Sequence, residues 1–116
     1  MATCGVDGDG TWTPFLATPN FPTYASGHST FSGAGAAAIG RFFGTDAISI
    51  CVAADPLSGI AGERCFSSLS AAAAEAGISR IYGGIYFEFD NGQAIDAGRN
   101  ISQFVTANNF GHGAVP

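Results

Sequence analysis

The sequence predicts a mainly α-helical fold, a partial helical bundle with one hairpin-like excursion at residues 47–66. Helices are indicated by apolar residues at helical spacing and by serine and glycine at the expected helix ends. The hairpin is indicated by the alternation of Ile48, Ile50 and Val52, which is followed by a turn signal at Pro56. Apolar residues make up 47% of the 116 residues and charged residues only 11%, so we expect one small packed domain rather than disorder.

The first half of the chain is expected to begin with an irregular segment at residues 1–11, which is rich in Gly, Asp and Thr. The first helix is predicted at residues 29–43, where many Gly and Ala residues allow another backbone to approach closely. Within the excursion, residues 60–66 are expected to pair back across the turn onto the strand that contains Ile50.

Two further helices are predicted in the second half. The earlier one covers residues 67–76, with Ser67 or Ser68 as its N-cap. Its stop is assigned to Gly77.

The last helix is predicted to start at Tyr86 or Gln93 and to end at Ala107, because its apolar residues recur at helical spacing. The remaining residues, 108–116, are expected to form a tail. The predicted elements thus amount to three helices of a bundle and one hairpin.

The charge pattern excludes two classes of function. The net charge is −5, and the chain has four arginines and no lysine. Nucleic-acid binding through a basic face and membrane binding through a polybasic patch are therefore not expected. No apolar stretch is long enough to span a membrane, because the run at residues 31–43 is short and contains Arg41.

The cysteines leave two interpretations open. Cys51 and Cys65 lie on either side of the turn signal at Pro56, a spacing that allows a disulfide to close the hairpin. A disulfide there would indicate a secreted protein. Two buried free thiols are the alternative, and Cys4 is a third cysteine.

One group of residues points to oxyanion chemistry. Ser26, Gly27 and His28 immediately precede a predicted helix, so a hydroxyl, a bare backbone and a helix N-terminus can all offer donors to an anion. His28 adds a group that exchanges protons near neutral pH. Arg80 adds a planar fork that can hold two oxygens of a phosphate-like ion. If these residues converge, they form a pocket for a tetrahedral oxyanion.

The same residues carry a resemblance to a known family. Residues 21–29 read Phe-Pro-Thr-Tyr-Ala-Ser-Gly-His-Ser, and Ser79-Arg80 is followed after five residues by Tyr86 and then by Asp90. These segments resemble the second and third motifs of the vanadium-dependent haloperoxidases and type 2 phosphatidic acid phosphatases, in the haloperoxidase-like branch. The similarity covers residues 12–107 and corresponds to the C-terminal part of that superfamily's helical domain.

The resemblance implies roles for individual residues. Ser26, Gly27 and Arg80 correspond to residues that hold the oxygens of vanadate or phosphate, and His28 corresponds to the acid-base partner. Tyr86 occupies the position of a histidine that binds vanadium or attacks phosphorus, and Asp90 corresponds to the residue that orients this histidine. Vanadate or phosphate is therefore the implied cofactor or ligand, with no certain metal site beyond it.

Two departures from the family pattern favour an incomplete site. Tyr86 is a poor nucleophile, since an unperturbed tyrosine has a pKa of about 10. The family's first motif needs a lysine, and this chain has none. Tyr86 is then a packing or hydrogen-bonding residue, and Asp90 either pairs with Arg99 or caps the last helix.

Two functions are consistent with this pattern. The chain either contributes to a haloperoxidase or acid phosphatase and is inactive by itself, or it is a non-catalytic remnant that self-assembles and has no cofactor. Both predict exposed apolar faces that contact another copy of the chain or a missing N-terminal portion.

Overall fold

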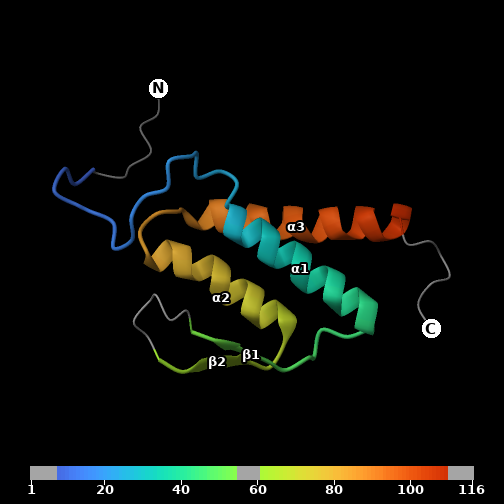
Figure 1. Ribbon diagram of the computed structural model, residues 1–116. Coiled ribbons are helices and arrows are strands. Elements are labelled where there is room, and N and C mark those ends of the chain that lie inside the picture. Colours follow the sequence, from blue (N-terminus) through green and yellow to red (C-terminus); the bar gives the residue numbers. More distant parts are fainter. Residues whose placement is uncertain (1–7, 55–60, 110–116) are drawn as a thin grey trace.

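The computed structural model describes residues 8–54 and 61–109. Over these residues the fold is mainly α-helical, as predicted, with a single two-stranded antiparallel sheet (Figure 1). In chain order the elements are α1 (Gly27–Phe43), β1 (Ile50–Ala53), β2 (Glu63–Phe66), α2 (Leu69–Tyr82) and α3 (Glu88–Asn109). Among the helices of this described part, none combines the length and the apolar character that a membrane crossing requires.

Helix α1 begins two residues earlier than predicted, at Gly27. Its N-cap is Ser26, whose hydroxyl oxygen accepts a hydrogen bond from the Ser29 backbone N–H at 3.4 Å. This bond satisfies one of the backbone donors that a helix start leaves unpaired. The helix ends at Gly44, which has a φ of 72° and so takes the left-handed conformation that favours glycine.

Helix α1 packs on both other helices and meets α3 backbone to backbone (Figure 1). A β-carbon at Gly33 would stand 2.7 Å from the Ile95 carbonyl oxygen, and one at Gly98 would collide with the backbone at Thr30. The prediction that the small residues of this helix serve close packing is therefore confirmed at Gly33, whereas no atom of another described element lies within 4 Å of a β-carbon at Gly35. The crossing places the N-terminal end of α1 beside the start of α3.

Helix α2 has the predicted N-cap at Ser68, whose hydroxyl oxygen accepts from the Ala71 N–H at 3.1 Å. The Asp46 carboxylate adds a second acceptor for this helix start, since the Ser70 N–H donates to it at 2.9 Å. The predicted stop at Gly77 is wrong, because α2 continues through this residue to Tyr82. Gly77 is buried beside Asn91 and Ser29, where a β-carbon has no room. Residue 77 is therefore a glycine that allows α2 to contact its neighbours, and it does not end the helix.

Helix α3 runs from Glu88 to Asn109, so it starts between the two predicted positions and extends two residues beyond Ala107. The first two residues of the predicted tail are thus helical, and the rest of it lies outside the described residues. The break between α2 and α3 falls at Gly83 and Gly84, and the φ of 73° at Gly84 requires a residue that tolerates the left-handed region.

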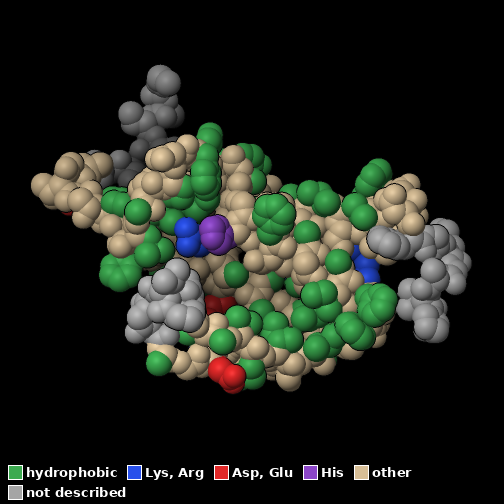
Figure 2. Space-filling view, viewed as in Figure 1, with side chains coloured by type: hydrophobic (Ala, Val, Ile, Leu, Met, Phe, Trp, Pro, Cys, Tyr) green, Lys and Arg blue, Asp and Glu red, His purple; other side chains and the backbone are tan. Residues whose placement is uncertain are grey.

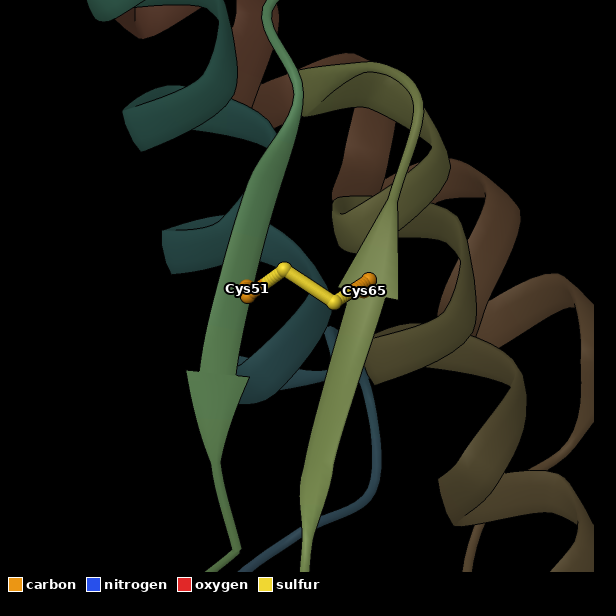
Figure 3. Close-up of a disulfide and its surroundings, with 2 residues drawn as sticks. All are labelled: Cys51 and Cys65. Atoms are coloured by element: carbon orange, nitrogen blue, oxygen red, sulfur yellow. A yellow bond between two sulfur atoms is a disulfide. The ribbon is translucent and has the colours of Figure 1, made fainter.

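The hairpin pairs Cys51 with Cys65 directly across the two strands, and a disulfide joins them (Figure 3). The turn that the sequence assigns to Pro56 lies outside the described residues. The hairpin is attached to α2 by Arg64, whose guanidinium donates to both carboxylate oxygens of Glu75 at 2.7 and 2.6 Å. Both partners are exposed, so this ion pair contributes little to stability.

The described residues bury few large apolar side chains. The buried apolar residues are Leu69, Ala73, Ile85, Tyr86 and Ala94. In contrast, many large apolar side chains are exposed, including Phe31, Phe42, Phe43 and Phe104. Figure 2 shows such apolar side chains spread over the helices. Three helices of this length therefore leave apolar faces uncovered, as the sequence predicts for a partial bundle.

Candidate oxyanion site

The candidate site lies where the N-terminal ends of α1 and α3 meet. The Ser26 N–H donates to the Asp90 backbone carbonyl at 3.3 Å, which ties the cap of α1 to the first turn of α3. Segments that are more than sixty positions apart in the sequence thus meet at one point. The end of α2 reaches the same region, since its Arg80 acts electrostatically on His28.

Ser26 is fully buried, and its hydroxyl belongs to an internal network. Its oxygen lies 3.0 Å from the Ser29 hydroxyl oxygen, which lies 2.6 Å from the side-chain carbonyl oxygen of Asn91. Because Asn91 offers only an acceptor there, the single proton of Ser29 is directed to Asn91, and the proton of Ser26 completes the contact between the two hydroxyls. In this arrangement the Ser26 hydroxyl supports the start of α1 and offers no proton to an external anion.

Gly27 and His28 occupy the first turn of α1, where backbone N–H groups have no intrahelical acceptor. His28 is exposed, and Figure 2 shows a histidine beside a basic side chain on the viewed face. Partial desolvation lowers the pKa of His28 below its ordinary value of 6.5, and the positive charge of Arg80 lowers this pKa further. The imidazole is therefore mainly neutral near neutral pH and can accept a proton.

Arg80 lies in the last turn of α2. Its backbone carbonyl accepts the Ile85 N–H at 3.3 Å and so helps to shape the turn into α3. The Nε atom of its guanidinium is buried and has no hydrogen-bond partner within residues 8–54 and 61–109. A buried cationic donor without a partner is costly, so this group is available for an anionic ligand.

Asp90 is fully buried and caps α3. Its Oδ2 atom accepts the Phe87 N–H at 2.9 Å, which is the carboxylate half of a capping box. Of the two roles that the sequence left open, the capping role is therefore the one observed. Arg99 lies 3.5 Å from Asp96 in an exposed pair instead. The second carboxylate oxygen of Asp90 is buried and has no partner in the described part of the chain.

Tyr86 lines a cavity whose described lining residues include none of the predicted oxyanion residues Ser26, Gly27, His28 and Arg80. Its ring is buried and lines a cavity together with Trp12 and Phe87. Its hydroxyl is also buried, and no described residue hydrogen bonds to it. Tyr86 therefore packs among aromatic side chains, which agrees with the packing role that the sequence favours for it.

Sequence reasoning assigned no role to Ser29 or Asn91, although both lie within the two motif segments. Ser29 directly follows the Ser-Gly-His run, and Asn91 directly follows Asp90. Their positions inside the motifs are the signal that could have identified them. The other histidine, His112, lies outside the described residues, as does Cys4.

The described donors fit a hydrogen-bonded oxyanion better than a directly ligated vanadate. Arg80 keeps an unpaired buried donor, and the first turn of α1 keeps unpaired backbone N–H groups. Tyr86 offers no histidine nitrogen, and the cavity that it lines includes none of these donors among its described lining residues. These residues therefore suit binding of a tetrahedral anion through hydrogen bonds and charge.

Comparisons with known proteins place the chain in a family. Residues 5–112 match the family described as the VCPO second helical-bundle domain. A solved structure, the first bacterial vanadium-dependent iodoperoxidase, superimposes with a TM-score of 0.72 and is 38% identical in sequence. The match covers 82% of this chain and 22% of the iodoperoxidase chain, so this chain spans about a fifth of that protein's length. No match was found among curated proteins. Its sequence and fold therefore make the chain a member of the VCPO second helical-bundle domain family and vanadium haloperoxidase-like.

Proposed function

We propose that this chain contributes the anion-binding part of a vanadium-dependent haloperoxidase or a related acid phosphatase, and that it is inactive by itself. One observation carries the proposal. At the N-terminal end of α1, His28 lies within the electrostatic reach of Arg80, whose buried Nε has no partner among the described residues. In such a pair the guanidinium can bind an anion and the neighbouring imidazole can accept a proton.

Each residue then has a defined task. The backbone N–H groups of Gly27 and His28 and the guanidinium of Arg80 hold the anion's oxygens. The His28 imidazole, kept mainly neutral by its lowered pKa, takes or returns a proton at the bound oxygens. Vanadate, when bound, supplies the centre at which hydrogen peroxide oxidises a halide. Ser26 fixes the start of α1 and acts through the position of Gly27.

The affinity of the isolated chain for vanadate or phosphate is expected to be low. With no lysine, Arg80 is the one cation that this proposal assigns to an anion carrying several negative charges. Each missing charge-assisted contact weakens binding by about 1.5 to 3 kcal/mol. Tyr86 also provides no nucleophilic or metal-binding nitrogen, so neither bromide oxidation nor phosphate release is expected.

The test is a titration of the purified chain with vanadate and with phosphate, followed by vanadium and phosphorus NMR. Weak binding is expected, and Arg80→Gln should abolish it, whereas the matched variant Arg99→Gln should leave it unchanged. Equal losses in the two arginine variants would show that binding follows net charge alone. Bromide oxidation that His28→Ala abolishes would disprove the proposed inactivity.

A second candidate function, self-assembly, is favoured by the exposed aromatic residues. Phe42 and Phe43 form an edge-to-face pair at the end of α1 with ring centroids 5.0 Å apart, and both rings are largely exposed. Burial of such a pair drives association of helical surfaces. Sedimentation analysis should then give an oligomer of fixed size, and a Phe42→Ser, Phe43→Ser variant should shift it to monomer. A monomer at all accessible concentrations contradicts this candidate.

A further inference from the structure

A cavity lies beside Tyr86, and apart from Tyr86 none of the predicted anion-site residues lines it. This cavity has a volume of about 650 Å³, which is within the range of pockets for small organic ligands. The N-terminal coil forms one wall with Trp12 and Thr18. The other wall is formed by Ile81 at the end of α2 and by Ile85 and Phe87 of the α2–α3 connection. Figure 1 shows the coil running past the end of α2. Leu16 holds it there, since its N–H donates to the Gly83 carbonyl at 3.0 Å.

The aromatic rings of Trp12 and Phe87 give the cavity flat surfaces on which a ring of a ligand could lie. A β-carbon at Gly84 would stand only 2.8 Å from the Trp12 ring, so the indole lies directly on the bare backbone of Gly84. Phe87 stacks on Phe89 with an angle of 6° between the ring planes, which orients a second aromatic side chain at this site. Trp12 and Phe87 are nevertheless 60% and 65% exposed, so a ligand between them would cover aromatic surface that the described residues leave open.

Two polar groups determine which ligand fits. The Tyr86 side chain is 94% buried, because its relative exposure is 6%, and its hydroxyl has no partner among the described residues. Asp9 lines the same cavity. Hydrogen bonds from the Thr11 hydroxyl and backbone N–H lower the pKa of Asp9, so its carboxylate is charged at neutral pH. Among the described lining residues there is no Lys or Arg to balance this charge.

We propose that this cavity binds a small aromatic amine. Its ring lies against Trp12 and Phe87, its ammonium group faces Asp9, and a polar ring substituent bonds the Tyr86 hydroxyl. The apolar walls disfavour any unpaired charge, and the Asp9 carboxylate offsets this cost for a cation but adds repulsion for an anion. None of the residues assigned to the oxyanion site except the replaced position Tyr86 lines this cavity, so the two proposals stand or fall separately.

Trp12 provides the measurement, because it is the only tryptophan in the chain. Three phenols that differ only in their para substituent serve as probes: tyramine is cationic, p-cresol is neutral and smaller, and 4-hydroxyphenylacetate is anionic. Trp12 fluorescence is excited at the long-wavelength edge of its absorption, where phenols absorb little, and calorimetry gives an independent affinity. We expect tyramine to bind most tightly, p-cresol less tightly and 4-hydroxyphenylacetate least.

Matched variants assign the contacts. Tyr86→Phe keeps the ring and removes the hydroxyl, so all three phenols should bind roughly 2- to 10-fold more weakly, as expected for loss of one hydrogen bond. Tyr82→Phe is the control, since Tyr82 is exposed and is not among the cavity's lining residues. Asp9→Asn keeps an acceptor for Thr11 and should remove the preference for tyramine over p-cresol.

Three results would overturn the proposal. The first is an unchanged Trp12 signal and no heat of binding up to the solubility limit of tyramine. The second is a Tyr82→Phe effect equal to that of Tyr86→Phe. The third is an anionic probe that binds as well as the cationic one. If Tyr86→Phe does not fold, the comparison of the three probes with Asp9→Asn decides the question alone.

Discussion

Gly77 in α2 lies so close to the Asn91 side chain in α3 that a β-carbon at Gly77 would collide with the amide. The same β-carbon would stand 3.0 Å from the Ser29 hydroxyl oxygen, so Gly77 covers the hydrogen bond between Ser29 and Asn91. Gly77→Ala should lower the free energy of unfolding by about 1 to 3 kcal/mol, because both neighbours belong to buried structure. Urea denaturation followed by circular dichroism measures the change.

Gly92→Ala is the matched control for that substitution. Gly92 is also a helical glycine, but apart from its chain neighbours and the nearby backbone of its own helix, no described atom lies within 4 Å of the place its β-carbon would occupy. Alanine should therefore raise the stability of the chain by up to about 1 kcal/mol through the better helix propensity. A Gly77→Ala variant as stable as Gly92→Ala would show that α2 and α3 are farther apart in solution.

The capping role of Asp90 can be separated from a role of its charge. Asp90→Ala removes the acceptor for the Phe87 N–H and should cost about 1 to 2 kcal/mol of stability. Asp90→Asn keeps an acceptor at the same place and removes a buried charge, so its stability should remain close to that of the unchanged chain. Thermal unfolding of the two variants gives the comparison, and equal losses would refute capping as the main role.

The lowered pKa of His28 predicts how stability depends on pH. The folded chain binds the His28 proton at a lower pH than the unfolded chain does, because the pKa of His28 in the unfolded chain is about 6.5 and folding lowers it. As the pH falls through 6.5 toward the folded-state pKa, the unfolded chain takes up this proton first and the free energy of unfolding decreases. Above 6.5 the contribution of His28 is constant.

Proton NMR of the imidazole signals measures this pKa directly. The His28→Gln variant identifies which of the two histidines gives each signal. Arg80→Gln should raise the pKa of His28 only part of the way to 6.5, because desolvation is the larger cause of its shift. No change in Arg80→Gln would mean that the two side chains are not neighbours.

The disulfide between Cys51 and Cys65 predicts a local loss of structure on reduction. The two cysteines are 14 positions apart, so the bond should stabilise the chain by roughly 3 kcal/mol through the loop it closes. A Cys51→Ser, Cys65→Ser protein should exchange its hairpin amides much faster, while the amides of α1 and α3 change little. Cys4→Ser is introduced into both proteins so that no third thiol takes part in exchange. Unchanged protection of the hairpin would contradict a structural role for the bond.

Local signals in the sequence predicted the order and type of the elements. Alternating apolar residues indicated the strand at Ile50, and a serine at the helix start indicated the cap at Ser68. The assignment of Gly77 failed because a glycine that ends a helix and a glycine that admits a neighbouring helix look alike in one sequence. Only the position of Asn91, which a contact across the fold sets, distinguishes them.

The sequence predicted which residues belong to the candidate site but not how their side chains are arranged. The motifs identified His28 and Arg80, and the structure places them within electrostatic reach of each other. The motifs gave no indication that the Ser26 hydroxyl contacts the Ser29 hydroxyl inside the protein. Nor did they indicate that Tyr86 lines a cavity with Trp12, because that contact depends on the path of an irregular coil.

The contact between α1 and α3 has a mechanical consequence. At Gly33 and Gly98 the two helices touch through main-chain atoms, which cannot relieve stress by changing rotamers as side chains do. Arg41 adds a hydrogen bond of 3.1 Å from its guanidinium to the Ser102 hydroxyl near the far end of the same helix. With the bond from the Ser26 N–H to the Asp90 carbonyl, helix α1 is therefore fixed to α3 at its start, its middle and its end. These three attachments hold the first turn of α1, which carries His28, in one position relative to α3.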